Sequence, residues 1–351
     1  MNRDDVLAAI ARNDTLEGLN LSGIDLAGAD LTGGRFWDTD LTGANFRGAN
    51  IQKTGFKNVI LQQACFDQVD LTRVDLRGLN LTGASFRQAT FFMTLLSEAD
   101  LTGADFSDTQ VRWTVIQNGK LNGANFRQAV LEKTLLQETD VAKADFTKAD
   151  LTRTVFMNAD LRTTVFTGAK FFKCVLRECN LAGIDLRGLT LSTVLADGAD
   201  FTDSDLSGCN LVMTNFMNAK LDRARLDGVD ARNAMFMKAR MQEASLRNAN
   251  LEQAFLGQAD LTGVDLRGAR LHTAVLQKAR LRGTQLQNAD CSFADFSHAD
   301  LSYANFTKAT LYMAKFHTVL IEKTCFDGAN TTLMRGTDPA LSEAENWNPP
   351  Q

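Results

Sequence analysis

Hydrophobic residues return at every fifth position along almost the whole chain. From Leu16 to Phe326 this spacing gives 63 positions, of which 60 hold Leu, Phe, Ile, Val or Met. The exceptions are Ala196, Ala231 and Cys291. The register never slips, so the sequence predicts that no loop is inserted inside this region.

A second regular position lies two residues before each large one and carries a small side chain. Between Ala29 and Ala329 it is Ala, Thr, Val, Cys, Ser or Gly at all but three of 61 places. The intervening residue is often Asp or Asn, as in ADLTGADF at residues 99–106. Side chains two apart on an extended chain point the same way, so both regular positions are predicted to face a core.

A five-residue period fits neither an α-helix of 3.6 residues per turn nor a plain strand with a period of two. It needs a chain that turns a corner every five residues. The residues after the large position are often Thr-Gly or Arg-Gly, which suits tight turns. The pattern therefore predicts an all-β solenoid.

These repeats resemble the pentapeptide-repeat family over residues 16–330. The resemblance implies a right-handed quadrilateral β-helix with four pentapeptides in each 20-residue coil. About 16 such coils at the usual strand spacing would extend about 75 Å. Because the known members are mostly not enzymes, the resemblance also implies a non-enzymatic protein. The acidic start followed directly by repeats is similar to proteins of bacterial type VI secretion loci, which implies an accessory or effector-loading role.

Both ends of a solenoid expose core and unpaired backbone groups, so both are expected to be capped. Residues 1–15 predict an N-terminal helical cap, with Val6, Leu7 and Ile10 on one side. Residues 331–351 predict a C-terminal cap and tail.

The C-terminal cap is predicted to be a short helix. Asp338 suits its N-cap and Pro339 its first turn. Leu341, Ala344 and Trp347 would share a face and cover the last coil, and the final residues NPPQ would form a loose tail.

One outward column departs from the polar consensus. It reads Leu95, Val115, Leu135, Val155, Val175, Leu195, Asn215, Met235, Phe255 and Val275, with Phe92, Trp113, Phe172 and Met213 on the same face. Contiguous exposed apolar and aromatic side chains mark interaction surfaces, so we expect this face, apart from Asn215, to bind another protein. Two alternatives stay open. Stacked Val and Leu also favour strand pairing without any partner, and a homodimer could use this face or the C-terminal cap.

Charge and composition restrict the kinds of partner and the cellular location that the sequence predicts. The net charge is −5, from 37 basic and 42 acidic residues, whereas nucleic-acid binders are usually basic. No apolar stretch is long enough to span a membrane, and the start lacks the features of a secretory signal. The six Cys have no framework spacing. We therefore expect a cytoplasmic protein without a direct nucleic-acid or membrane partner.

Residues that could carry chemistry are few. His272, His298 and His317 fall on outward positions, and the last two lie on neighbouring coils. No acidic or Cys partner for them is evident, so solvated side chains are expected rather than a metal site. The inward positions of Cys174, Cys179, Cys209 and Cys291 indicate core packing. We expect no catalytic residue, no cofactor and no metal.

The alternative function is a DNA mimic. Some pentapeptide-repeat proteins protect DNA gyrase by presenting an acidic rod that resembles duplex DNA. Here Asp residues line one side, but Lys120, Lys220 and Arg247 are among the cations interleaved with them. A mimic should present a continuous negative field, which disfavours this alternative.

Overall fold

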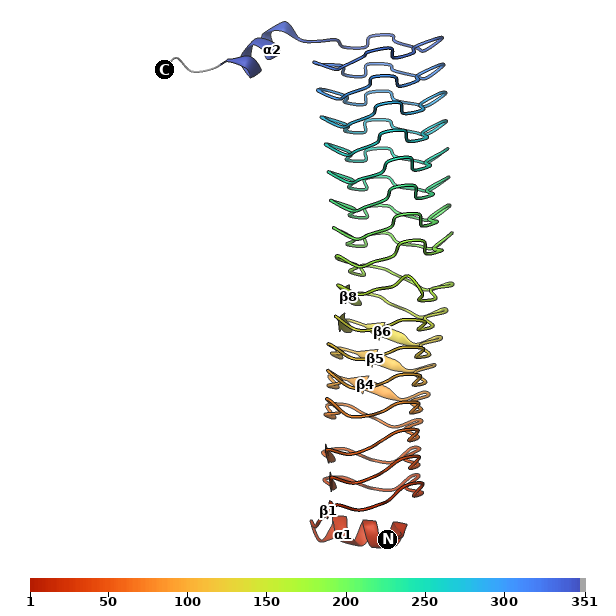
Figure 1. The fold of residues 1–351 in the computed structure, drawn as a ribbon, viewed down its shortest axis with the longest axis vertical. Helices are drawn as coiled ribbons and strands as arrows, with labels where there is room; N and C mark the ends of the chain where they lie inside the picture. Colours follow the sequence, from red (N-terminus) through yellow and green to blue (C-terminus); the bar gives the residue numbers. More distant parts are fainter. Residues whose placement is uncertain (348–351) are drawn as a thin grey trace. The chain divides into compact units, whose positions relative to one another are not determined.

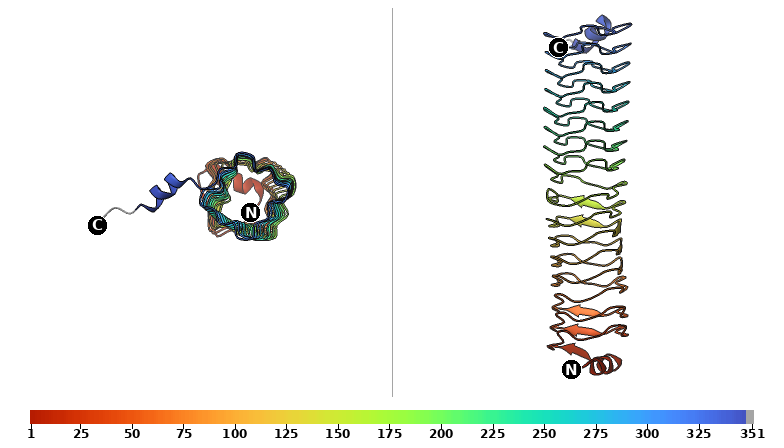
Figure 2. Two further views of the ribbon diagram at one scale, coloured as in Figure 1. Left: turned by 90° about the horizontal axis from the view of Figure 1, so that it is seen from above. Right: turned by 90° about the vertical axis from the view of Figure 1, so that its right-hand side faces the viewer.

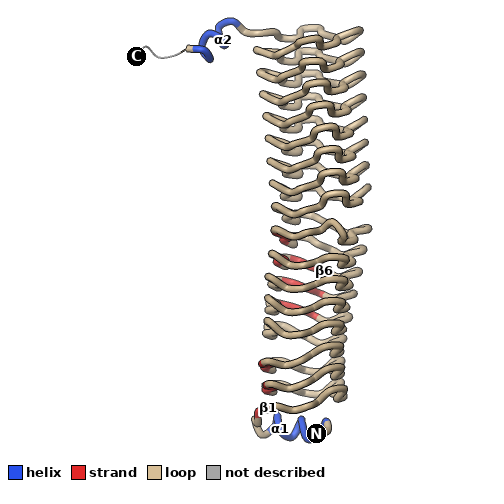
Figure 3. Tube along the Cα trace, in the orientation of Figure 1, coloured by secondary structure: helices blue, strands red, loops and turns tan. Residues whose placement is uncertain are grey.

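The computed structural model describes residues 1–347, so the predicted NPPQ tail lies outside the described residues. The chain forms two compact units, Met1–Val175 and Leu176–Gln351, which are described separately. The elements are α1 (Arg3–Ala11), β1 (Thr15–Glu17), β2 (Arg35–Trp37), β3 (Gly55–Lys57), β4 (Thr90–Phe92), β5 (Gln110–Arg112), β6 (Val130–Glu132), β7 (Leu135–Gln137), β8 (Val155–Met157) and α2 (Pro339–Asn346). Figure 3 shows how short these strands are beside the turns and loops that make up most of each coil.

Each coil of both units contains 20 residues, as predicted. In the first unit β1, β2 and β3 form one parallel sheet, β4, β5 and β6 a second, and β7 and β8 a third. Leu135 of β7 pairs with Val155 of β8, 20 residues later. In the second unit isolated parallel bridges keep the same interval, as between Asp200 and Lys220. The all-β solenoid is therefore confirmed, and the coils of each unit stack one on the next (Figure 1). The number of coils and their handedness stay predictions.

The corners of the coil are tight turns made by the two residues after each large one. In the turn from Leu26 to Ala29, the N–H of Ala29 donates to the Leu26 carbonyl at 3.1 Å. Gly28 between them has a φ of +63°. This is the geometry of a type II turn, which requires a positive φ at its third residue. The frequent Gly at this position follows from that requirement.

Most of the predicted core positions are buried. Phe46, Phe66, Phe86, Phe106, Phe126, Phe146 and Phe166 stack ring on ring along one column, with centroids 4.6–5.5 Å apart. Rings from the opposite column meet them edge-on, as Phe156 meets Phe146 at 5.8 Å. Thr replaces Ala at some small inward positions, where its hydroxyl finds a carbonyl. The buried Thr139 hydroxyl, for example, donates to the Ile116 carbonyl at 2.6 Å.

Helix α1 closes the open end of the first unit, where Figure 2 shows it across the mouth of the first coil. Asn2 and Asp5 cap it reciprocally, each side chain accepting the other's backbone N–H. Val6 and Ala9 are buried against the coil, which agrees with the predicted cap.

Helix α2 lies beside the coils of the second unit and does not cover their end. Asp338 caps it, accepting the N–H groups of Ala340 and Leu341, as predicted. However, Leu341 is 48% exposed and Trp347 67%. Ala344 is exposed too. The expected cover over the last coil is therefore wrong, and Ile321 of that coil remains 54% exposed. Among the described residues, neither helix has the length or the apolar character needed to cross a membrane.

Candidate functional site: an apolar outward column and a histidine–glutamate cluster

The polar outward columns have a local structural reason. Where Asp or Asn precedes the large residue, its side chain accepts the N–H two residues later. Asp105 accepts the Ser107 N–H at 2.9 Å, and Asp145 accepts the Thr147 N–H at 2.8 Å. The consensus Asp thus holds the corner turn and implies no ligand site.

In the first unit one column gives up this hydrogen bond. It consists of Leu95, Val115, Leu135, Val155 and Val175, and we call it the first apolar column. Consecutive members form parallel pairs, so at the usual strand spacing the column is about 19 Å long. All five side chains reach the surface, and Leu95 is 36% exposed.

Aromatic residues flank the first apolar column. Phe92 is half-buried at the end of β4, Trp113 is 51% exposed and Phe172 is 45% exposed. The ammonium group of Lys133 lies 4.1 Å from the centre of the Trp113 ring. Trp113 also has a φ of +53°, a conformation that a bulky side chain occupies at a cost. A large apolar side chain is therefore held at an exposed and strained turn.

The second unit carries a less regular apolar column. It is made of Leu195, Met235, Phe255 and Val275, with Met213 beside them. Phe255 is 43% exposed and Met213 58%. Asn215 interrupts this column, because its side chain accepts the Met217 N–H at 2.9 Å. Asp295 follows Val275 and ends it. None of the thirteen predicted binding residues is buried, so their outward placement agrees with the sequence analysis. Their role in binding stays a prediction.

Some of the acidic outward residues are paired with cations. Within single turns Arg187 pairs with Asp185 at 2.7 Å, and between coils Lys120 pairs with Asp100 at 3.2 Å. Burial tends to raise the pKa of Asp265. Hydrogen bonds from Arg267 and Arg247 outweigh that effect and lower the pKa to about 2. Such pairs neutralise part of the negative charge along these columns and interrupt a continuous negative surface.

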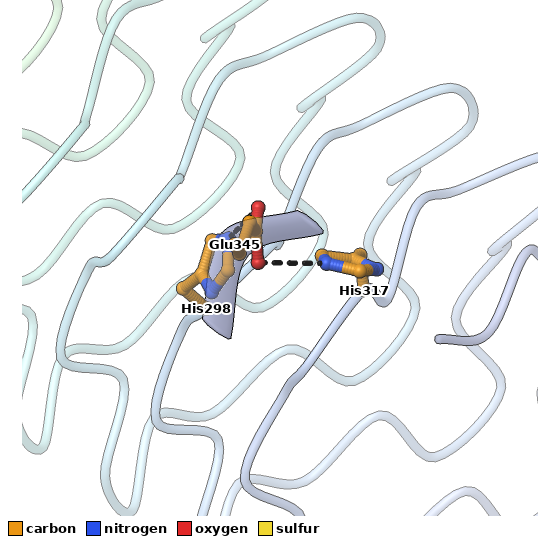
Figure 4. Close-up of side chains that lie close together, drawn as sticks. All are labelled: His298, His317 and Glu345. Atoms are coloured by element: carbon orange, nitrogen blue, oxygen red, sulfur yellow. Dashed lines mark hydrogen bonds and ion pairs between the residues drawn. The ribbon is translucent and has the colours of Figure 1, made fainter. Parts of the chain in front are cut away.

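Two histidines of the second unit converge on a glutamate of α2 (Figure 4). Glu345 lies 3.2 Å from His298 Nε2 through one carboxylate oxygen and 3.1 Å from His317 Nε2 through the other. Hydrogen bonding by His317, with a smaller contribution from His298, holds the pKa of Glu345 below its usual value, despite the opposing effect of burial. The donor atoms of all three side chains lie within 4.8 Å of one another.

This cluster corrects the expectation of solvated histidines. His317 is only 6% exposed, and its Nδ1 accepts the backbone N–H of Asp338 at 3.1 Å. The sequence placed His298 and His317 on neighbouring coils but identified no acidic partner. The Asp338-Pro339 start did predict the helix that carries Glu345, so a signal for the helix existed, although none showed where it packs.

The buried cysteines behave as core residues. Cys209 donates to the Leu186 carbonyl at 2.9 Å, which is the bond that Thr makes at equivalent positions. Burial raises the pKa of its thiol to about 11 and also raises that of Cys291. Thiols held in the neutral form are poor nucleophiles and poor metal ligands.

Models of known families match most of the repeat region. A model described as "Pentapeptide repeat region" matches residues 49–126 and 69–146. A second, described as "Pentapeptide repeats (8 copies)", matches residues 20–63, 142–177, 169–212, 199–237, 214–253, 239–277, 254–290 and 274–312. A search of curated protein sequences gave no match.

Solved structures of repeat solenoids are also similar. QnrB1, described as a plasmid-mediated fluoroquinolone resistance protein, shares 19% identity over 67% of this chain and 92% of its own, with a TM-score of 0.25. HetL, a pentapeptide repeat protein involved in heterocyst differentiation regulation from the cyanobacterium Nostoc, shares 26% identity over 80% of this chain and 97% of its own, with a TM-score of 0.17. A pentapeptide repeat protein from the thylakoid lumen of Arabidopsis thaliana shares 27% identity over 35% and 69%, with a TM-score of 0.20.

Proposed function

The chain belongs to the pentapeptide-repeat family, and on this premise we propose that it is a non-enzymatic scaffold that binds another protein through the first apolar column. The observation that carries the proposal is the loss of a structural hydrogen bond at consecutive positions whose side chains reach the surface. Elsewhere in the first unit the same pentapeptide position most often holds Asp or Asn, which locks the turn. In this column it holds Leu or Val, which cannot accept that bond and leaves apolar surface in water.

The flanking side chains indicate the chemistry of the partner. Lys133, Arg153 and Lys173 occupy successive turns beside the column, next to Trp113 and Phe172. Arg153 lies 3.9 Å from Glu132, and all three cationic groups remain at the surface. An apolar strip with a basic border suits a partner that offers a row of apolar side chains beside acidic ones.

The first experiment replaces Leu135 and Val155 by Asp in the full-length chain. Because Asp is the consensus residue at this position, the coils should still form, as far-UV circular dichroism and thermal unfolding would show. Affinity purification from the native cell lysate, followed by mass spectrometry, then compares the double variant with the wild type. A protein captured by the wild type and absent with the double variant is the expected result.

The matched control is Val165→Asp. Val165 occupies the same pentapeptide position in the same unit, is 43% exposed and lies on a different face, in a column with Asp145. This variant should capture the same protein as the wild type. Equal capture by all three proteins would contradict the proposal. If the Asp pair unfolds the coils, Leu135→Thr with Val155→Thr places β-branched side chains at both positions and makes the column less apolar.

A homodimer is a further use of the first apolar column, and sedimentation of wild type and double variant separates it from binding of a different protein. The DNA-mimic alternative predicts that gyrase is captured equally by the wild type and the double variant. The pairing of Asp100 with Lys120 and of Asp185 with Arg187 disfavours that alternative, since a mimic needs unpaired acids. No family match concerns type VI secretion, so a role there adds no support to the scaffold proposal.

A further inference from the structure

We propose that His298, His317 and Glu345 form a binding site for a single Zn²⁺ ion that fastens α2 to the coils of the second unit. Imidazole nitrogen and carboxylate oxygen are ordinary zinc ligands, at about 2.0–2.2 Å from the metal. Ligands at those distances in a tetrahedral arrangement lie about 3.3–3.5 Å from one another. The two His–Glu separations, 3.2 and 3.1 Å, run to different oxygens of Glu345 and are each close to this spacing. One donor atom from each side chain lies within 4.8 Å of the others, so a shift of the side chains would complete the set.

The fold holds the three side chains in place through separate elements. His298 and His317 belong to neighbouring coils, and their rings lie 5.2 Å apart at a steep angle. His317 is almost completely buried, and Glu345 comes from the last turn of α2. Three protein ligands from three segments would leave further positions to water or a small anion. The groove around them has a volume of about 560 Å³ and includes both cations, such as Lys278, and acids, such as Asp295, which pairs with Lys315 at 3.6 Å.

The hydrogen-bond partner of Nδ1 determines whether each histidine can bind zinc through Nε2 without rearrangement. Zinc at Nε2 requires the imidazole proton to sit on Nδ1. His298 Nδ1 lies in hydrogen-bond contact with the Thr318 hydroxyl, which can accept that proton. His317 Nδ1 instead accepts the backbone N–H of Asp338, so its proton now lies on Nε2 and donates to Glu345. Zinc binding must therefore open the Asp338 contact while keeping the Thr318 contact.

This asymmetry gives the proposal a local signature. Adding zinc should shift the Asp338 amide resonance and speed its hydrogen exchange, because its acceptor is lost. Thr318→Val should weaken zinc binding about tenfold, the usual effect of losing an outer-shell partner of a ligand histidine.

The test is calorimetric titration of the metal-free full-length chain with Zn²⁺, supported by the visible spectrum of the Co²⁺ form. Wild type is expected to bind one equivalent. His298→Ala and Glu345→Gln should each weaken binding by at least about tenfold. Glu345→Gln keeps an oxygen acceptor for α2, so it separates metal ligation from helix packing. His272→Ala is the matched control, because His272 lies in the same unit outside the cluster and packs against Phe293.

Either of two results would overturn the proposal. One is the absence of saturable zinc binding by the wild type at neutral pH. The other is equal zinc binding by wild type, His298→Ala and Glu345→Gln, which would place the metal elsewhere, for example on the partly exposed Cys65 or Cys325.

Discussion

Removing one ring from the phenylalanine column tests whether the core of the first unit depends on continuous stacking. Phe126 is fully buried, with Phe106 stacked at 4.6 Å on one side and Phe146 at 4.7 Å on the other. Phe126→Ala leaves a ring-sized cavity and should cost about 3–5 kcal/mol of unfolding free energy. Two lost aromatic pairs, each worth about 0.5–1.5 kcal/mol beyond area burial, place the expected value at the upper end of that range.

Phe236→Ala provides the comparison. Phe236 is equally buried but stacks on Phe216 alone, at 5.2 Å, because Leu256 occupies the next coil of its column. Phe236→Ala should therefore lower the unfolding free energy by about 1 kcal/mol less than Phe126→Ala does. Because solenoids need not unfold in one step, the assay is native-state hydrogen exchange at amides of the altered coil. One such amide is the Phe126 N–H, which donates to the Asp145 carbonyl. A loss below about 2 kcal/mol, or one no larger than that of Phe236→Ala, would refute the stacking argument.

Two further changes probe the polar interior and the paired surface. Thr139→Val removes the hydroxyl that contacts the Ile116 and Gln137 carbonyls. It should lower the free energy of unfolding in urea by about 1–2 kcal/mol, while Thr139→Ser should retain most of the stability. Equal losses of unfolding free energy in the two variants would show that the hydroxyl is unimportant. Since Asp265 has a pKa lowered from 3.8 to about 2, its stabilisation is complete above pH 4 and disappears as the pH falls through about 2. Asp265→Asn should therefore lower stability at pH 7 by about 1–2 kcal/mol and weaken its decline between pH 4 and pH 2. An unchanged pH profile of urea midpoints would contradict the assignment.

The repeat made the interior of each coil predictable from the sequence. Phe126 and Cys209 are buried because their places in the pentapeptide point inward, and no long-range information was needed to assign them. The packing of α2 was not predictable in this way. Leu341 and Trp347 suggested a helix that covers the last coil, but Glu345 instead meets His298 and His317 on the side of the coils. Contacts made by a segment outside the repeat depend on tertiary packing, which a periodic pattern does not encode.

The unbroken 20-residue interval also has a consequence for recognition. A surface that repeats itself at each coil looks nearly the same after a shift of one coil, about 4.8 Å along the stack. A partner that contacted only Leu and Val of the first apolar column could therefore dock in several offset positions of similar energy. Phe92, Trp113 and Phe172 occur at uneven intervals beside that column. These irregularly spaced aromatic side chains would favour one of the offset docking positions over the others.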